Sequence, residues 1–516
     1  MNKFFQFNEF VELGKVFKDC EAYLIALENF NRAIALSYLP INKERLVEAY
    51  DLRGTTKIHL KRYTEAISDY TKGIELDPKN NNLFLLRGLA YREKRKYKEA
   101  ISNYNKAIDL NPDIPNQFNV RGWTYYYLKN NDKAIEDANK AIDLNPDEPD
   151  HFRLRGWTYH QLGIEDKAIE DATKAIDLNP DEPDYYNLRG DAYFLLKDYK
   201  KVVEDANKAI DLDADKPQYF NLRAWAYHCL KDYKKAVEDA NKAIDLNPDE
   251  PYHFNLRGWA YYRIKDYKKA VEDANKAIDL NPDNSDHFNM RGYAYYSLKN
   301  YDTAIEDANK AIDLNPDKPD NFRLRGWAYY RIKDYKKAIE DANKAIDLNP
   351  EEPQHFDMRG WIYYRLKNYI TAIEDANKAV DLNPGDPDHF NLRGWAYHKL
   401  GKEDNAIKDA TKAIDLNPDD PDHFNLRGDA YFHLKNYKKV VEDANKAIDL
   451  NPDNPDHFDM RGWAYYRLKD YKKAFEDANK AIDLNPDEPQ HFRLRGWAYY
   501  FLKDFKKAIE DAIQKL

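Results

Sequence analysis

The sequence predicts an all-α solenoid of antiparallel helix pairs, and three observations lead to that prediction. The dipeptide Arg-Gly recurs every 34 residues from Arg53 to Arg495, fourteen times in one register, with Ala224 the only replacement of its glycine. No unit contains the alternating β-branched run that a strand requires. A unit of this length cannot bury its own apolar face and must stack on its neighbours. The chain is therefore expected to be one continuous solenoid.

Residues 1–46 are predicted to form a degenerate first repeat. Phe10, Gly14, Ala26 and Ala33 occupy the positions that bulky and small residues hold in the later units. A loop six residues longer than usual follows around Pro40. The chain therefore begins with a helix pair of the same kind but of weaker pattern.

Residues 47–516 are predicted to form fourteen tandem repeats, the last shortened inside its second helix. In the unit 387–420, Pro387 opens a first helix, where its missing N–H costs nothing, and Asp386 can cap that helix. A second helix carries the stretch AIKDATKAIDL, and Asn417 with Pro418 ends it. Two helices per unit follow from this pattern.

This unit resembles the tetratricopeptide repeat family. Counted from the opening proline, the family has a bulky residue at position four, Gly at eight, an aromatic at eleven, Ala at twenty and twenty-seven, and Pro at thirty-two. The matching residues in one repeat are Phe390, Gly394, Tyr397, Ala406, Ala413 and Pro418. The resemblance covers residues 7–516, or fifteen repeats. It implies a right-handed superhelix, a concave groove lined by the first helices, and a non-enzymatic scaffold for protein partners.

Composition limits the classes of function. A net charge of −10 argues against a nucleic-acid ligand, because phosphate binding needs a basic stripe. Only Cys20 and Cys229 occur, which favours a reducing compartment over a disulfide framework. No apolar run approaches membrane-spanning length, and the first residues lack the apolar segment of a signal peptide. The sequence predicts a cytoplasmic protein without membrane contact.

Arginine at position seven departs from the family, which usually has leucine there, as at Leu13. Position seven points into the packing face, where a guanidinium needs a paired anion. Asp at position twenty-three is the nearest candidate, as in Arg393 with Asp409. Pairing within one repeat leaves a single mismatch, Arg87 with Asn103, whereas pairing with the preceding repeat leaves two. The arginines are predicted to be structural and paired within their own repeat.

Tryptophan is the candidate functional residue, because all nine tryptophans stand at position nine. Positions five, nine and twelve share a helix face opposite the packing residues. An Asn at position five can both donate to and accept from an extended peptide backbone, and an indole four residues on can wall a side-chain pocket. The arrangement is similar to the Asn/Trp arrays of armadillo proteins, an analogy across folds.

The predicted peptide-binding residues comprise positions five and nine of successive repeats. At position five they are Asn119, Arg153, Asn187, Asn221, Asn255, Asn289, Arg323, Asp357, Asn391, Asn425, Asp459 and Arg493. At position nine they are Trp123, Trp157, Asp191, Trp225, Trp259, Tyr293, Trp327, Trp361, Trp395, Asp429, Trp463 and Trp497.

Three other interpretations stay open. The aromatics at position nine can simply pack against the neighbouring first helix. The same ladder suits a carbohydrate or single-stranded RNA ligand. An architectural protein that associates end to end, with an idle groove, is the third, since the chain stops at Leu516 without a polar capping helix.

Neither an enzyme, a cofactor nor a metal site is predicted. No nucleophile–base pairing, Gly-rich phosphate loop or Cys/His cluster is visible in the sequence. Eight histidines stand at position three, one per repeat, a spacing that suits first-turn packing better than convergent metal ligands.

Two stretches of the chain resemble each other at an offset of 238 residues, or seven repeats. The repeats from Pro183 and Pro421 both contain the sequence GDAYF, which no other repeat has. Most other repeats have an aromatic residue in place of its Asp. The repeats before them share histidine and glutamate, namely His160 and Glu165 with His398 and Glu403. Duplication of a seven-repeat block is the economical explanation.

Overall fold

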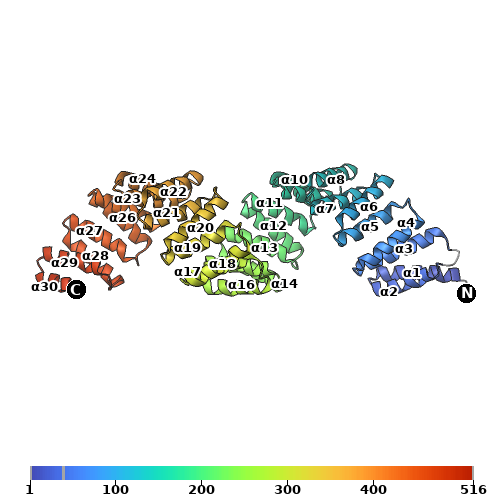
Figure 1. The fold of residues 1–516 in the computed structure, drawn as a ribbon, viewed down its shortest axis with the longest axis horizontal. Helices are drawn as coiled ribbons and strands as arrows, with labels where there is room; N and C mark the ends of the chain where they lie inside the picture. The colour runs from blue at the N-terminus through green and yellow to red at the C-terminus, as the bar shows by residue number, and fades with distance from the viewer. Residues whose placement is uncertain (1–2, 38–40, 514–516) are drawn as a thin grey trace. The chain divides into compact units, whose positions relative to one another are not determined.

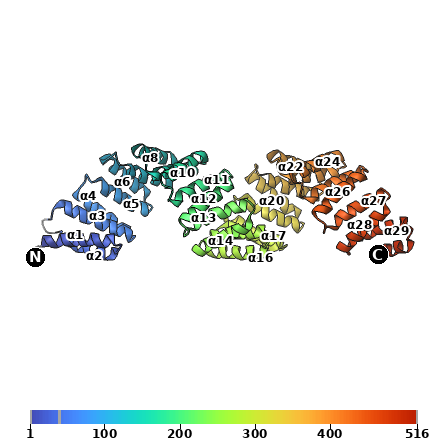
Figure 2. The same ribbon diagram turned by 180° about the vertical axis from the view of Figure 1, so that it is seen from behind.

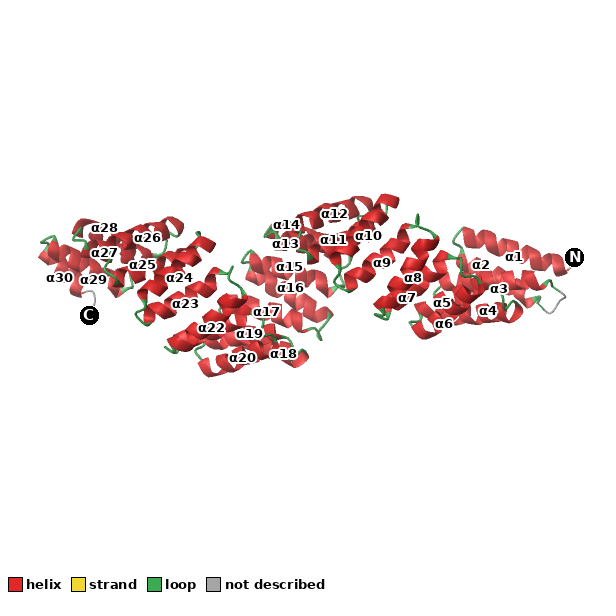
Figure 3. Cartoon of the chain, turned by 90° about the horizontal axis from the view of Figure 1, so that it is seen from above, coloured by secondary structure: helices red, strands yellow, loops and turns green. Residues whose placement is uncertain are grey.

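The computed structural model describes residues 3–37 and 41–513. Within these ranges the chain forms thirty α-helices and no strand, with short loops between the helices (Figures 1 and 3). The predicted all-α fold is confirmed. Pro40, at the centre of the predicted long loop, lies outside the described residues.

The chain divides into two compact units, residues 1–260 and 261–516. The helices of the first are α1 (Lys3–Asp19), α2 (Tyr23–Ala35), α3 (Lys43–His59), α4 (Tyr63–Leu76), α5 (Asn81–Glu93), α6 (Tyr97–Leu110), α7 (Pro115–Tyr127), α8 (Asn131–Leu144), α9 (Pro149–Gln161), α10 (Glu165–Leu178), α11 (Pro183–Leu195), α12 (Tyr199–Leu212), α13 (Pro217–Cys229), α14 (Tyr233–Leu246) and α15 (Pro251–Arg263), whose last residues belong to the second unit.

The second unit continues with helices of 13 or 14 residues, except the last, α30, which has 9. They are α16 (Tyr267–Leu280), α17 (Ser285–Ser297), α18 (Tyr301–Leu314), α19 (Pro319–Arg331), α20 (Tyr335–Leu348), α21 (Pro353–Arg365), α22 (Tyr369–Leu382), α23 (Pro387–Lys399), α24 (Glu403–Leu416), α25 (Pro421–His433), α26 (Tyr437–Leu450), α27 (Pro455–Arg467), α28 (Tyr471–Leu484), α29 (Pro489–Phe501) and α30 (Phe505–Ile513). Within each unit, successive helix pairs lie side by side (Figures 1 and 2).

The helix boundaries follow from local chemistry. Pro387 is the first residue of α23, and the Asp386 carboxylate accepts a hydrogen bond from the Asp388 N–H at 3.0 Å, as the sequence predicts. After α24, the side chain of Asn417 accepts from the N–H of Asp419 at 3.3 Å and shapes the turn into the next repeat. The turn contact recurs, for example at Asn145 and Asn179, whereas Glu148 and Glu182 make no side-chain cap.

Small residues let the helices approach closely. A Cβ atom on Gly394 would lie 2.6 Å from Cδ2 of Leu426 in the next repeat, so glycine at position eight makes room for the following first helix. Ala406 and Ala413 are completely buried, as is Leu392. The positions that carry the family resemblance therefore form the packing face.

The predicted pairing of arginine and aspartate is confirmed. Arg393 donates from Nε and Nη2 to the two carboxylate oxygens of Asp409, both at 2.8 Å. The hydrogen bonds of Asp409 raise the pKa of Arg393, which keeps the guanidinium charged. Bidentate pairing of the same kind runs from Arg53 with Asp69 to Arg495 with Asp511, and Arg87 is an exception, because it bonds Asn103, as the sequence predicts.

The arginine makes two further contacts that the sequence did not predict. Nη1 of Arg393 donates to Oδ1 of Asn377 in the preceding repeat at 2.9 Å. Its guanidinium also lies 5.3 Å from the ring centroid of Phe390. Each guanidinium therefore joins two repeats as well as the two helices of its own repeat.

Candidate functional site

The predicted site residues lie on the first helix of each repeat, and their exposure determines whether a ligand can contact them. The indole at position nine is half-buried from Trp123 to Trp463, and Trp497 is 46% exposed. The ring at position twelve of the same helix packs edge to face against most of these indoles; the centroids of Trp327 and Tyr330, for example, are 5.4 Å apart at an angle of 89°. The indoles are therefore held in place and keep part of their surface open.

Position five reaches the aromatic of the preceding repeat. The guanidinium of Arg153 lies 5.3 Å from the ring centroid of Trp123, and that of Arg493 lies 5.2 Å from the centroid of Trp463. These are cation–π distances. Positions five and nine thus form one surface that runs across the boundary between repeats.

Position five also faces position three of the following repeat. Asn289 donates to Oδ1 of Asn321 at 3.0 Å, and Asp357 lies 3.4 Å from Nδ1 of His389. Burial raises the pKa of the Asp357 carboxyl. The position-three histidines are themselves buried, in agreement with the predicted first-turn packing.

Several asparagines at position five carry an unused acceptor. Their Oδ1 atoms are buried and have no hydrogen-bond partner among the described residues; these asparagines are Asn119, Asn221, Asn255 and Asn391. An unpaired buried acceptor costs about 1–3 kcal/mol. A ligand or water that supplies the donor would remove this cost.

A pocket in the first unit brings four predicted residues together. Its lining includes Asn187 and Asp191 of one repeat and Asn221 and Trp225 of the next. Asn187 donates to the Asp191 carboxylate at 3.1 Å. Burial raises the pKa of Asp191 to about 6. The pocket therefore combines an aromatic wall with polar groups that can donate or accept.

Sequence reasoning missed Tyr252, which belongs to this pocket. It stands at position two of its repeat, where most repeats have Asp or Gln, and its hydroxyl accepts a hydrogen bond from the Trp225 indole N–H. An aromatic at a usually polar position was the available signal. A second pocket, lined by Trp123, Arg153 and Tyr127, lies on the same face.

The predicted residues do not form one set. Those from Asn119 to Trp259 belong to the first unit and those from Asn289 to Trp497 to the second.

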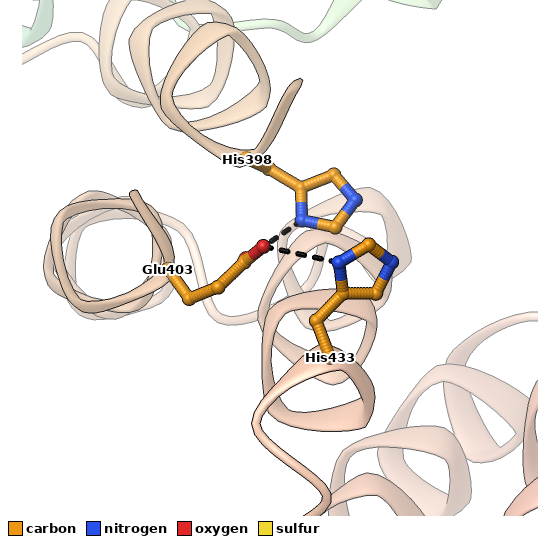
Figure 4. Close-up of side chains that lie close together, drawn as sticks. All are labelled: His398, Glu403 and His433. Carbon is orange, nitrogen blue, oxygen red and sulfur yellow. Dashed lines mark hydrogen bonds and ion pairs between the residues drawn. The ribbon is translucent and has the colours of Figure 1, made fainter. Parts of the chain in front are cut away.

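A cluster of two histidines and a glutamate was not predicted. Nδ1 of His398 lies 2.8 Å from one carboxylate oxygen of Glu403, and Nδ1 of His433 lies 3.1 Å from the other (Figure 4). From the sequence, only the position-three histidines were considered as possible metal ligands. These three stand at positions twelve, seventeen and thirteen, so only the comparison of the two duplicated blocks pointed to part of the cluster.

Four sequence models of one family, each described as tetratricopeptide repeat, match this chain. They match residues 47–80, 82–114, 115–148, 154–182, 183–216, 217–250, 255–319, 289–353, 323–387, 387–420, 424–454 and 458–488. These ranges cover most of the chain. The chain belongs to the tetratricopeptide repeat family.

One solved structure shows the same fold, and a second is similar over part of its course. A chain in the crystal structure of the APC/C hetero-tetramer Cut9-Hcn1 has a TM-score of 0.52 and 15% identity, covering 90% of this chain and 98% of its own. Yeast Tom70 has a TM-score of 0.42 and 17% identity, covering 85% of this chain and 100% of its own. Comparison with curated protein sequences found no significant match.

No helix in the described ranges is both long enough and apolar enough to cross a membrane. Cys20 is exposed and Cys229 half-buried, and both are free thiols.

Proposed function

We propose that the chain is a non-enzymatic interaction scaffold that binds an extended peptide or protein segment along positions five and nine of its first helices. Membership of the tetratricopeptide repeat family supports a scaffold in general. The free thiols of Cys20 and Cys229 support the cytoplasmic location that belongs to the same proposal.

The observation that carries the proposal is the pocket around Trp225. A half-exposed indole beside Asn221, with Asp191 and Asn187 from the preceding repeat, offers a side-chain recess next to groups that can bond a backbone. The buried Oδ1 of Asn221 is an unpaired acceptor that a backbone N–H can satisfy once the side chain rotates towards the pocket. Because the backbone of an extended peptide also repeats at regular intervals, such a peptide can make similar contacts with successive repeats of this surface.

A peptide suits this surface better than RNA. The pocket contains a carboxyl group, Asp191, and the chain carries a net charge of −10. Both the carboxylate of this pocket and the net charge of the chain would repel a phosphate group, whereas the pocket at Trp123 is lined by Arg92, Arg95 and Arg153. Arg153 and Arg493 at position five already make cation–π contacts with Trp123 and Trp463, so their charges are partly engaged within the protein.

End-to-end self-association is a second candidate, favoured by one observation. The helices α29 and α30 expose a group of large apolar side chains, with Trp497 46%, Tyr500 50%, Phe505 54% and Ile509 60% exposed. Contiguous exposed aromatics mark interaction surfaces. Light scattering over a range of concentrations tests this candidate, which a strictly monomeric chain would contradict.

The peptide proposal is tested with linear peptides selected from a random library on the wild-type chain. Substituting Trp225→Ala together with Trp327→Ala should weaken their binding roughly 30-fold or more, because truncation of a groove hot spot costs at least about 2 kcal/mol. The matched control replaces Leu212 and Ile370 by alanine; both are exposed and lie on second helices.

Circular dichroism and thermal melting accompany the binding measurement. The tryptophan variant should keep its helical content and melt close to the control. A lower melting temperature than the control would show that the indoles are structural. Unchanged peptide affinity in a folded variant would show that they do not contact the peptide. Either result contradicts the proposal.

A further inference from the structure

Three side chains from three helices converge in the second unit. His398 lies near the end of α23, Glu403 is the first residue of α24, and His433 is the last residue of α25 (Figure 4). One nitrogen or oxygen from each lies within 4.8 Å of the others. The side chains of His398 and Glu403 are 5% and 8% exposed, whereas that of His433 is 60% exposed. The cluster is thus built into the fold on one side and open to solvent on the other.

The fold itself does not require this cluster. In other repeats the same two positions carry an edge-to-face aromatic pair, such as Tyr330 and Tyr335, with ring centroids 5.9 Å apart. The pair His398 and Glu403 replaces that packing with a polar contact. A buried carboxylate brings a desolvation cost that the aromatic pair lacks. His160 and Glu165 make the same replacement, so it is the convergence of the third side chain, His433, on the pair that points to a ligand.

Two imidazoles and one carboxylate are a ligand set for zinc and related divalent metal ions. Zn–N distances of about 2.0 Å place tetrahedral ligand atoms about 3.3 Å apart. The ring nitrogens lie 2.8 and 3.1 Å from the Glu403 oxygens. Small side-chain rotations would therefore admit an ion in place of the two bridging protons.

A further carboxylate is at hand. Asp429 stands four residues before His433 on α25, so both side chains lie on one face of that helix. Its carboxyl group interacts electrostatically with both His398 and His433. A second negative charge beside the rings would strengthen the attraction for a cation.

We propose that His398, Glu403 and His433 bind a divalent transition-metal ion of the zinc class, with Asp429 or water completing the coordination. The ion would connect the repeat 387–420 to the repeat that follows it. Binding to the folded chain alone would raise its stability. The proposal needs no peptide and concerns the ends of the helices, although His398 and Asp429 stand at positions twelve and nine of the proposed peptide-binding face.

The duplicated block supplies a natural control. Nδ1 of His160 lies 2.8 Å from the Glu165 carboxylate, as in the His398–Glu403 pair. The counterpart of His433 is Leu195, which is 54% exposed. The first unit therefore has two of the three ligands and should not bind the ion.

The test is a titration of the full chain with Zn²⁺ by calorimetry and with Co²⁺ by visible absorption. Loss of an outer-shell partner typically weakens metal binding about 10–100-fold, so loss of a ligand should cost at least tenfold. We expect His433→Leu to remove the tight site. Leu195→His should create a second site, which doubles the stoichiometry.

Both substitutions are at exposed positions, so the variants should keep the metal-free melting temperature of the wild type. Equal Zn²⁺ affinity of wild type and His433→Leu would overturn the proposal and leave a hydrogen-bonded cluster only. Failure of Leu195→His to gain a site would also overturn it, because three such ligands would then not suffice.

Discussion

The arginine at position seven contacts its own repeat and the preceding one through a single guanidinium. Arg393 bonds Asp409 in its own repeat and Asn377 in the preceding one, while stacking on Phe390. Asp409 is only 6% exposed at its side chain. Water can reach little of this carboxylate, so Arg393 is its main charged partner.

Removing that arginine should strand the aspartate. We expect Arg393→Leu to lower the free energy of unfolding by about 3 kcal/mol, since it leaves an uncompensated buried charge. Adding Asp409→Ala should restore part of the loss. Urea denaturation of both variants measures this, and a double variant less stable than the single one would contradict the pairing argument.

The chain contains its own control for this prediction. Arg87 pairs with the neutral Asn103, at 2.8 Å, and burial lowers the pKa of Arg87 where no carboxylate faces it. Arg87→Leu leaves an unpaired amide instead of a charge. We expect it to cost only about 1–2 kcal/mol.

Asp191 should make stability depend on pH. Burial raises its pKa to about 6 in the folded chain, against about 3.9 when unfolded. Between these values the folded state binds more protons than the unfolded state, so the contribution of Asp191 to stability falls as the pH rises from 4 to 6 and stays low above.

Asp191→Asn removes this ionisation and keeps an acceptor for Asn187. Its stability gain over the wild type should be clear at pH 7.5 and should vanish towards pH 4. Urea denaturation at three pH values measures the difference. A gain of the same size at every pH would show that Asp191 does not titrate in this window.

How far the sequence predicts a residue's role depends on whether its partner shares its repeat. The pairing of Arg393 with Asp409 followed from helical phase and from counting mismatches between positions. The bonds to Asn377, the stacking of Arg153 on Trp123 and the part played by Tyr252 cross the repeat boundary. Phase within one helix carries no information on the angle between neighbouring repeats, so these contacts needed the structure.

At the scale of the element, the turn between the two helices of a repeat has one constrained residue. Position fifteen adopts the left-handed conformation, usually as lysine, for example Lys333 with φ 65°. Glycine fills it only at Gly163 and Gly401, with φ 71° and 70°. Most repeats therefore have a residue with a side chain in the left-handed conformation at this turn, which retains some backbone strain.

Relieving the strain should stabilise the chain. Lys333 is exposed, so Lys333→Gly removes little besides the unfavourable conformation. We expect a gain of about 0.5 kcal/mol, after the larger entropy loss of glycine is subtracted. The reverse change, Gly163→Ala, should destabilise, although no atom lies within 4 Å of the added Cβ. Thermal melting of both variants measures this, and a loss of stability in Lys333→Gly would refute the strain argument.

At the scale of the whole molecule, stability is a sum over neighbours. Within each unit, a helix contacts its partner and the helices of adjacent repeats, and it makes no contact with more distant ones among the described residues. The periodic sequence predicted this linear order, and the fourteen regular repeats make the interfaces nearly identical. In such an array a repeat with a neighbour on both sides is protected better than one with a single neighbour.

Hydrogen exchange should therefore be graded along the chain. The first pair, α1 and α2, has the weakest repeat pattern and, among the described residues, a neighbouring repeat on one side only. At the other end, α30 already exposes Phe505 and Ile509, so its opening uncovers little additional apolar surface. We expect amides there to exchange fastest, and those of interior pairs such as α11 with α12 and α23 with α24 to exchange slowest. Mass spectrometry of deuterium uptake by peptide resolves the difference, with the metal ion removed by a chelator so that a bound ion does not protect α23 to α25. Equal protection at the ends and in the interior would mean that opening involves the chain as a unit, and the description as a sum of neighbouring interfaces would be wrong.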